Sequence, residues 1–329
     1  MTQAFVIGGT RFIGRHLVET LLAHGDDVTI FNRGRHENPF ADEPDVDHAT
    51  GDRTEPDSLE RAAQAVEPDI VFDMVAYHPE AVEHATRVFA DADAYVYVSS
   101  GAAYAAEEVP KREDETPLEP CSSEQAIDDT PETYGNRKAA GDRAVFEAAD
   151  RGVNAMAVRP PIVYGPHDYT ERLAYWLHRI ENQGRIVVPG DGTNLWQRAY
   201  VEDVARGLRL VAERGTPGEA YNVGDRNAVT LDRMVELAAR ALETDVDVVH
   251  ASNRELSVAN LDAEAFPLYR PYPHLLSTAK IAALGWDSTP VETAMARTVT
   301  DYRKSSRTGI ENGPDRDVEE RVLAVLETL

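Results

Sequence analysis

The sequence predicts an α/β protein: a doubly wound parallel sheet with a smaller, mixed α/β substrate domain towards the C-terminus. Short apolar runs typical of buried strands alternate with helical patterns through the first half of the chain, and the second half is less regular. At 329 residues the chain also exceeds the length at which one hydrophobic core keeps growing. Repeated strand and helix units imply parallel strands, right-handed crossovers and helices on both faces of the sheet.

The first half supplies the strands of the main sheet. Apolar residues at helical spacing follow the first strand, and Gly25 ends the helix that they predict. Thr54 and Asp57 predict a capped start for a second helix. The strands are expected at 4–8, 27–31, 69–77, 94–100 and 153–166.

A further helix is expected from Tyr134 to Ala149, opened by Thr130 and Pro131. The acidic, proline-bearing span 107–132 before it is expected to be a surface loop.

The second half predicts a separate set of elements. Helices are expected at 169–184, 201–215 and 231–243, the last capped by Thr230, and another begins after Pro290. Extended segments are expected at 185–190, 219–224 and 246–251, of which 219–224 could return to the main sheet. The predicted domains are 1–165 with 199–224, and 166–198 with 225–306. Residues 307–329 form a linker and an amphipathic helix that must pack on this chain or on a partner.

Charge is the most unusual bulk property of the sequence. With 58 acidic against 33 basic residues the formal net charge is −25. Such a surface repels itself, but at about 1 M salt the Debye length falls to roughly 3 Å and the repulsion is screened. The composition indicates a salt-accumulating halophile, such as a halophilic archaeon, with an ordinary acidic protein as the alternative. It also argues against nucleic-acid partners, which need basic patches.

Other features narrow the class of protein. Cys121 is the only cysteine, so neither an internal disulfide nor a cysteine-rich zinc site is expected. The ten histidines lack ligand spacing, and we expect no metal. No apolar run approaches the roughly 20 residues that span a bilayer, and the N-terminus lacks a basic segment followed by an apolar one. We expect a soluble, cytoplasmic protein without a membrane partner.

A glycine-rich turn joins the first strand to the first helix. Gly8 allows the tight turn, Gly9 follows it, and Gly14 lets the helix approach the strand. The unpaired amides at the start of the helix would meet a pyrophosphate. Because the turn lies between a strand and a helix at the start of a doubly wound pattern, it predicts a Rossmann fold that binds a dinucleotide.

Residues after the second strand predict which dinucleotide is bound. Folds that prefer NAD place an acidic residue there to accept from the ribose hydroxyls. This chain has Asn32, Arg33 and Arg35 instead, which predicts NADP, with NAD as second choice. Arg11, in the place of a turn glycine, lies at the helix mouth within reach of the same phosphate. The alternative is that Arg33 and Arg35 are solvated and Arg11 stacks on the adenine.

A tyrosine and a lysine are spaced for proton transfer. Tyr134 and Lys138 are four residues apart on one predicted helix, so both point from the same face. Ser99 and Ser100 end a strand at its carboxyl edge, where ligands of open α/β sheets bind. Free tyrosine has a pKa of about 10, and a neighbouring ammonium favours the phenolate that could accept a hydroxyl proton. A buried tyrosine beside an exposed lysine is the alternative.

Seven segments together resemble one family. The sequence is similar to the extended short-chain dehydrogenases/reductases, which include the NAD(P)-dependent nucleotide-sugar epimerases and dehydratases. The matching segments cover most of residues 4–300 and are GGTRFIG, YVSSGAAY, YGNRK, RPPIVYGP, RAYVEDVARG, AYNVG and ALGW.

The resemblance implies roles for individual residues. Tyr134 would be the acid/base, Lys138 would hold the nicotinamide ribose, and Ser100, four residues before Tyr104, would hydrogen-bond the reacting oxygen. Asp52 could accept from the adenine amino group or could merely be a helix-start charge. The implied cofactor contacts are Gly8, Gly9, Thr10, Arg11, Phe12, Ile13, Gly14, Asn32, Arg33, Arg35, Asp52, Ala76, Tyr134, Lys138 and Pro161.

The sequence also departs from the family pattern. Gly101 and Ala102 stand where sugar 4,6-dehydratases carry an Asp-Glu pair, so dehydration by that route is not expected. The form GGTRFIG resembles a branch that includes chloroplast stem-loop RNA-binding proteins. The fourth strand ends DMVAY rather than HLAA, and His78 beside it faces either substrate or water.

These features predict an enzyme rather than a binding module. Arg198 matches a position where nucleotide-sugar enzymes contact a diphosphate, and Arg270 could be a second clamp, although either could be a surface ion pair. We expect an epimerase/dehydratase-like enzyme acting by hydride transfer on a nucleotide sugar or related carbohydrate. The alternatives are an NADP-dependent reductase or dehydrogenase, and a non-catalytic dinucleotide-sensing or RNA-binding relative. A homodimer is expected by analogy.

Overall fold

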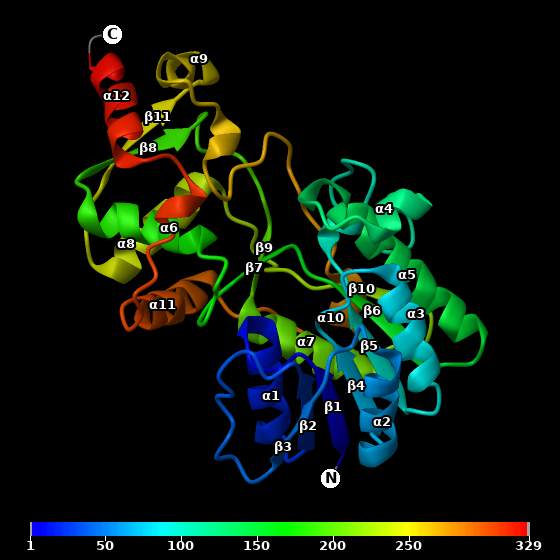
Figure 1. Cartoon of the computed structure of the whole chain (residues 1–329). Coiled ribbons are helices and arrows are strands. Elements are labelled where there is room, and N and C mark those ends of the chain that lie inside the picture. The colour runs from blue at the N-terminus through cyan, green and yellow to red at the C-terminus, as the bar shows by residue number, and fades with distance from the viewer. Residues whose placement is uncertain (1, 328–329) are drawn as a thin grey trace. The chain divides into compact units, whose positions relative to one another are not determined.

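The computed structural model describes residues 2–327, which form two compact units (Figure 1). The first unit contains the residues up to Val163 together with 201–224 and 276–288. The second contains 164–200, 225–275 and the chain from Thr289 onward. We describe the two units separately.

A seven-stranded parallel sheet forms the centre of the first unit, in the order β10-β6-β5-β4-β1-β2-β3. The α/β, doubly wound fold predicted from the sequence is thereby confirmed. The predicted strand at 219–224 does return to this sheet, where it pairs with β6. The strands are β1 (Gln3–Ile7), β2 (Asp27–Asn32), β3 (Val46–Thr50), β4 (Ile70–Asp73), β5 (Ala94–Val98), β6 (Ala155–Arg159) and β10 (Ala220–Asn222).

Helices cover this sheet, which explains why its central strands are continuous apolar runs. Helices α1 and α7 pack together, as do α3 and α5 (Figure 1). Phe5, Phe31, Leu59, Phe89 and Val145 belong to one buried cluster that includes strand and helix residues. The helices of the unit are α1 (Phe12–Ala23), α2 (Pro56–Val66), α3 (Pro79–Val88), α4 (Ser123–Ile127), α5 (Tyr134–Asp150), α7 (Val201–Arg214) and α10 (Ala279–Ala283).

The strand order reverses between β1 and β4. These two strands pair with each other although β2 and β3 lie between them in the sequence. From β1 the chain runs outward through β2 and β3, and from β4 it runs the other way. Ligands of open α/β sheets bind at the carboxyl ends of the strands on either side of such a reversal. The turn after β1 and the loop after β4 are therefore the segments that should bind a ligand.

The second unit is built around a short parallel ladder. Strands β8 (Arg185–Pro189) and β11 (Asp247–Ala251) pair in it, and helices α6 and α8 pack against each other, as do α8 and α11. Its helices are α6 (Arg172–Asn182), α8 (Leu231–Leu242), α9 (Asn253–Leu256), α11 (Val291–Tyr302) and α12 (Arg316–Leu326). The short strand β9 (Arg198–Tyr200) also belongs to this unit, whereas β7 (Ile162–Tyr164) begins in the first unit and ends at the first residue of the second.

The C-terminal helix packs on its own chain. The Glu319 side chain of α12 is buried, and its Oε1 accepts a hydrogen bond of 2.7 Å from the Val187 amide of β8. Its Oε2 pairs with Arg179 at 3.2 Å and Arg316 at 2.9 Å. Of the two alternatives for this amphipathic helix, packing within the chain is the one observed, although residues 328–329 of the predicted element lie outside the described residues.

Some predicted boundaries differ from the structure. The predicted cap of the second helix is wrong: α2 begins at Pro56 after Glu55, because the Thr54 hydroxyl donates to Asp52 instead. The prolines at 160–161 split the expected strand at 153–166 into β6 and β7. Residues 276–288 pack with the first unit, not with the substrate domain as expected, since the Trp286 indole donates to the Asp203 carbonyl at 2.9 Å.

Candidate active site

The turn after β1 has backbone conformations that favour glycine and a close approach between the strand and the helix. Gly8 and Gly9 have φ of +122° and +92°, and a Cβ on Gly14 would come 2.7 Å from the Gly9 nitrogen. Phe12 begins α1 at φ +40°, an uncommon value for a bulky residue and one typical of functional turns. Arg11 is the N-cap residue of α1, but its side chain makes no capping hydrogen bond, and no acidic residue lies in the first turn of the helix. The start of the helix is therefore suited to an anion, which fits the dinucleotide predicted for this turn.

Asn32 ends β2 beside this turn with both ends of its amide occupied. Its Nδ2 donates to the Gly8 carbonyl at 3.3 Å. Its Oδ1 accepts from the Gly34 amide at 2.7 Å and is 3.1 Å from His48 Nε2. An oxygen that already has two partners is poorly placed to accept from a ribose hydroxyl. The acceptor that NAD-preferring folds provide at this point is thus engaged within the protein.

Positive charge gathers around this position. Arg11, Arg33 and Arg35 are exposed, and Arg11 Nη1 lies 3.4 Å from His36 Nε2. The Thr54 amide, followed by its hydroxyl, lowers the pKa of the Asp52 carboxyl, and Arg33 and Arg35 lower it further. The Asp52 carboxylate accepts hydrogen bonds from the Thr54 amide and hydroxyl, at 3.0 and 2.8 Å, so it stabilises the turn in which it lies.

Lys138 is fully buried inside the first unit. Its Nζ donates to the carbonyl of Ala76, after β4, at 2.9 Å, and to that of Val98, at the end of β5, at 2.7 Å. Burial lowers the pKa of this ammonium to about 7, an effect that Asp73 and Asp142 partly offset. The alternative prediction, a buried tyrosine beside an exposed lysine, does not agree with the buried position of Lys138.

Three aromatic rings surround the Lys138 ammonium. The ring centroids of Tyr97, Tyr77 and Tyr134 lie 4.8, 5.3 and 5.9 Å from Nζ. Tyr134 is half-buried at the first position of α5, and Tyr77 is 46% exposed. A positively charged lysine this close to a phenol stabilises the negative charge of the deprotonated phenol. The arrangement is therefore suited to stabilising a phenolate.

The serine turn lies against the start of α5. A Cβ on Gly135 would come within 2.4 Å of the Ala102 carbonyl oxygen, so only glycine permits this approach. Ser100 is half-buried and its Oγ accepts from the Ala102 amide at 3.2 Å, whereas Ser99 is buried. The structure therefore brings the Ser100 segment next to Tyr134, and Ser100 is the more accessible hydroxyl of the two.

His78 joins two loops of the first unit. Its Nδ1 lies 3.0 Å from the Ala126 carbonyl and its Nε2 2.8 Å from the Asp129 carboxylate. Both neighbours are hydrogen-bond acceptors of the protein, so both ring nitrogens are directed at protein groups. The remaining predicted cofactor residues lie on the expected segments: Thr10 and Ile13 in the first turn of α1 or just before it, Ala76 after β4, and Pro161 after β6.

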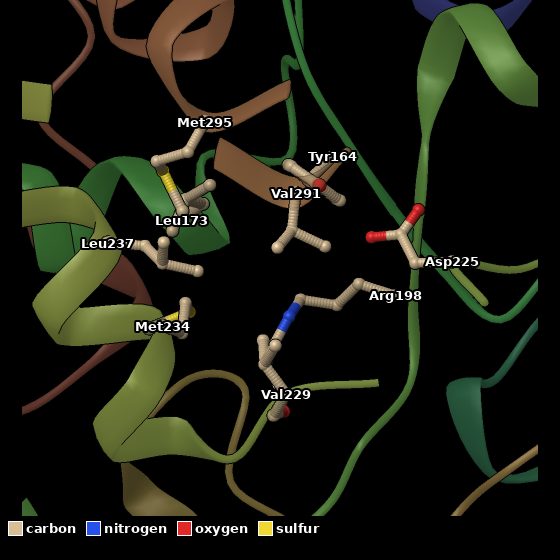
Figure 2. A pocket seen from close by; sticks show the side chains of 9 residues that line it. All are labelled: Tyr164, Leu173, Arg198, Asp225, Val229, Met234, Leu237, Val291 and Met295. Carbon is tan, nitrogen blue, oxygen red and sulfur yellow. Dashed lines mark hydrogen bonds between the residues drawn. The ribbon is translucent and has the colours of Figure 1, made fainter. Parts of the chain in front are cut away.

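Arg198 lies in the second unit, at the edge of an apolar cavity with room for about one water molecule. Its Nη2 donates to the Val229 carbonyl at 2.9 Å, and burial lowers the pKa of the guanidinium. Figure 2 shows the guanidinium extending towards Val229 and away from the Asp225 carboxylate. The rest of the lining is Tyr164, Leu173, Met234, Leu237, Val291 and Met295.

Arg270, the other predicted clamp, lies over the Trp196 ring, 5.6 Å from its centroid.

Within residues 2–327 no group of three or more histidine, cysteine or acidic side chains is placed to hold a metal ion. Among the same residues no helix is both long and apolar enough to cross a bilayer.

Sequence reasoning missed two groups beside this site. Asp73 ends β4 fully buried and pairs with Arg53, from the loop before α2. Tyr77 was not singled out although it lies beside Lys138. A carboxylate at the end of an otherwise apolar strand was the available signal for Asp73, but its partner could not be identified from spacing.

The fold and the turn after β1 define an α/β protein of the dinucleotide-binding class. Residues 4–224 match the model of the NAD dependent epimerase/dehydratase family. The chain belongs to this family.

Known proteins of several activities resemble this chain. It is 26% identical over 298 residues to the chloroplast stem-loop binding protein of 41 kDa b of Arabidopsis thaliana, covering 86% of this chain and 74% of that protein. It is 23% identical over 332 residues to the dTDP-D-glucose 4,6-dehydratase of Mus musculus, covering 92% and 89%. The crystal structure of a Bacillus anthracis dTDP-glucose 4,6-dehydratase with NAD superposes with a TM-score of 0.74 at 19% identity, covering 93% of this chain and 98% of that one.

Proposed function

We propose that this protein is an NADP-preferring enzyme that transfers a hydride to or from a carbon of a nucleotide sugar or related carbohydrate. The observation that carries the proposal is the buried Lys138 beside Tyr134, next to the Ser100 turn. Nicotinamide supplies the hydride acceptor when the cofactor is bound. Tyr134 would take the proton of the substrate hydroxyl, and Ser100 would hydrogen-bond the same oxygen.

Lys138 has two functions in this proposal. Its charge favours the Tyr134 phenolate, so that a phenol can act as a base near neutral pH. Two of its three N–H groups are used by the Ala76 and Val98 carbonyls, which leaves the third for a ribose hydroxyl. A lysine fixed by two backbone carbonyls has little rotamer freedom left to lose when the cofactor binds.

The NADP preference is supported by the cation cluster at the end of β2. A 2′-phosphate would find Arg33, Arg35 and Arg11 nearby and no carboxylate at position 32 to repel it. Asn32, whose oxygen already has two partners, offers little to the ribose hydroxyls of NAD.

Arg198 supports an anionic substrate. It donates a single hydrogen bond to the described part of the chain, although a guanidinium carries five N–H donors. A buried arginine with unused donors is suited to a phosphate group. Dehydration is not part of the proposal, since Gly101 and Ala102 bring no acid or base to the Ser100 turn.

A reductase of a small ketone is the second candidate, and the cation cluster favours it, because NADPH commonly serves net reduction. A non-catalytic RNA-binding relative is disfavoured by the net charge of −25 and by the intact Ser100, Tyr134 and Lys138.

The first experiment identifies the ligand that protein purified in high salt carries. Retained NAD would indicate an epimerase and contradict the NADP preference. Readily exchanged NADP would support that preference and favour a reductase, and no dinucleotide would indicate a binding module. UDP-glucose and dTDP-glucose would then be tested as substrates. Tyr134→Phe should bind cofactor normally and lose turnover, while the exposed Tyr272→Phe should keep both. Turnover retained by Tyr134→Phe would refute the assigned mechanism.

The acidic surface motivates a separate proposal, that the protein works at high salt. The chain has a net charge of −25, and its exposed carboxylates repel one another unless salt screens them. We expect loss of the helical circular dichroism signal on dialysis from about 2 M to about 0.05 M KCl, where the Debye length grows several-fold. Full stability at the lower concentration would contradict it.

A further inference from the structure

The carboxylate of Asp73 lies fully buried at the carboxyl end of β4, beside the reversal in strand order. Its Oδ1 accepts from Arg53 Nη1 at 2.5 Å and from the Val75 amide at 3.3 Å. Its Oδ2 accepts from the Tyr95 hydroxyl at 2.8 Å. Both oxygens therefore bind protein groups, and Asp73 acts on its surroundings and not directly on a ligand.

Arg53 connects this carboxylate to a third segment. Its Nη2 donates to the Ala81 carbonyl in the first turn of α3 at 2.9 Å, and its side chain is 11% exposed. The loop before α2, the end of β4 and the start of α3 are thus held by one ion pair. The β4–α3 loop, residues 74–78, is fixed at both ends.

This loop carries one of the two acceptors of Lys138. Ala76 follows Asp73 by three residues, and the Asp73 contact with the Val75 amide sets the turn just before it. The Ala76 carbonyl then receives Lys138 Nζ at 2.9 Å. A change at Asp73 would move this carbonyl, and with it the ammonium beside Tyr134.

Asp73 also contributes charge. Lys138 has no carboxylate within ion-pairing distance in the described part of the chain. Among the charges that raise the pKa of Lys138, the charge of Asp73 has the largest effect. The charge of Asp142 has the next largest effect, but its carboxylate is paired with Arg159 at 2.8 Å. The groups that face Lys138 are Asp73 from β4, Asp142 and Arg137 from α5, Arg53 from the loop before α2, and the rings of Tyr77, Tyr97 and Tyr134.

We propose that Asp73 is a positioning residue of the reaction centre: with Arg53 it fixes the loop whose Ala76 carbonyl receives Lys138, and its negative charge favours the ammonium form of Lys138. Its role in the reaction rests on the function proposed above for Lys138. The Asp73–Arg53 pair holds two opposite charges near one lysine, so single substitutions of the two should act in opposite directions.

The test is a titration of lysine side chains by NMR, with 13C at Cε. The chain has only four lysines, and the Lys138 resonance is the one lost in Lys138→Met. In wild type this resonance should titrate near pH 7. In Asp73→Asn the midpoint should fall by about one pH unit, the lower end of the shift that a neighbouring opposite charge causes. In Arg53→Gln it should rise.

Controls separate charge from packing. Tyr95→Phe removes the hydrogen bond to Asp73 Oδ2 and leaves the charge, so the midpoint should stay. If Asp73→Asn leaves Arg53 unpaired and does not fold, Arg53→Gln alone decides the question. A Lys138 midpoint that is unchanged in the charge variants, or that moves the other way, overturns the proposal.

A second readout connects the titration to the reaction. The alkaline limb of kcat/KM should move to lower pH in Asp73→Asn, together with the NMR midpoint. Because the titration needs no substrate, it gives its answer even if the protein has no turnover. If the proposed function is wrong, the wild-type protein will be inactive but the variants will still show the expected shifts of the Lys138 midpoint. If this inference is wrong, the wild-type enzyme will be active but the Lys138 midpoint will not move in the variants.

Discussion

The two ends of the proposed cofactor site are built in opposite ways. Around Lys138 the protein supplies two carbonyls and four charged groups that are buried or nearly so. Of the three aromatic rings beside it, that of Tyr97 is buried, that of Tyr134 is half-buried and that of Tyr77 is exposed. Around Asn32 the protein supplies exposed arginines. In a buried site small displacements and charge changes have large effects, whereas exposed charges are screened by solvent. The first end should therefore determine turnover, and the second should adjust the choice of cofactor.

The largest effect is expected at the buried end. Lys138→Met removes the charge that favours the Tyr134 phenolate while keeping much of the side-chain volume. Turnover should fall by about 10²- to 10⁴-fold, the range typical of lost acid–base assistance. Single-turnover reduction of the cofactor, followed at 340 nm, measures it. Lys304→Met, on the exposed surface, is the control, and activity of Lys138→Met within a few-fold of wild type would remove the lysine from the mechanism.

The next effect is expected at the exposed end. Arg33→Ala should reduce the affinity for NADP by about 10- to 150-fold, the worth of one charge-assisted hydrogen bond, and spare NAD. Exposure places the expected value near the lower limit. Fluorescence titration with both reduced cofactors measures the ratio. Arg61→Ala, an exposed arginine of α2, should leave the ratio unchanged, and an equal loss for both cofactors would contradict a phosphate contact.

Much of this contrast could be predicted from the sequence. Gly14 is at a position of close backbone approach, and the spacing of Gly8, Gly9 and Gly14 predicted it. Tyr134 and Lys138 share one helix, so their spacing revealed them. By contrast, Asp73 and Arg53 are 20 residues apart on different elements, and only the fold brings them together.

Other elements carried no readable pattern. Strand β3 is an edge strand with exposed side chains, so VDHAT shows no apolar alternation. The second helix was given the wrong cap because Thr54 had two possible partners, a helix amide and the Asp52 carboxylate two residues before it, and local spacing cannot choose between them.

The pH dependence of stability should also distinguish the two ends. The pKa of Lys138 is about 7 in the folded protein against 10.5 for an unperturbed lysine. Between these values the unfolded chain binds a proton that the folded one lacks, so this residue makes stability rise with pH, by at most about 1.4 kcal/mol per pH unit. Urea unfolding of cofactor-depleted protein at pH 7, 8 and 9 measures the slope. Lys138→Met should flatten it and Arg33→Ala should not; equal slopes in wild type and Lys138→Met would contradict the burial argument.

The smallest effect tests whether the exposed end can be converted to NAD preference. An acidic residue at position 32 is what NAD-preferring folds use, so Asn32→Asp would be the obvious exchange. Here Asn32 Nδ2 donates to the Gly8 carbonyl, and an aspartate would set an oxygen against that carbonyl instead. The new carboxylate would also repel the 2′-phosphate, but solvent and the exposed arginines screen this repulsion. NADP affinity should therefore fall only about 2- to 10-fold, with no gain for NAD. Asn32→Ser, which adds no charge, is the control. Improved NAD binding by Asn32→Asp would mean that the side chain can turn away from Gly8, and that its present contacts do not determine the cofactor.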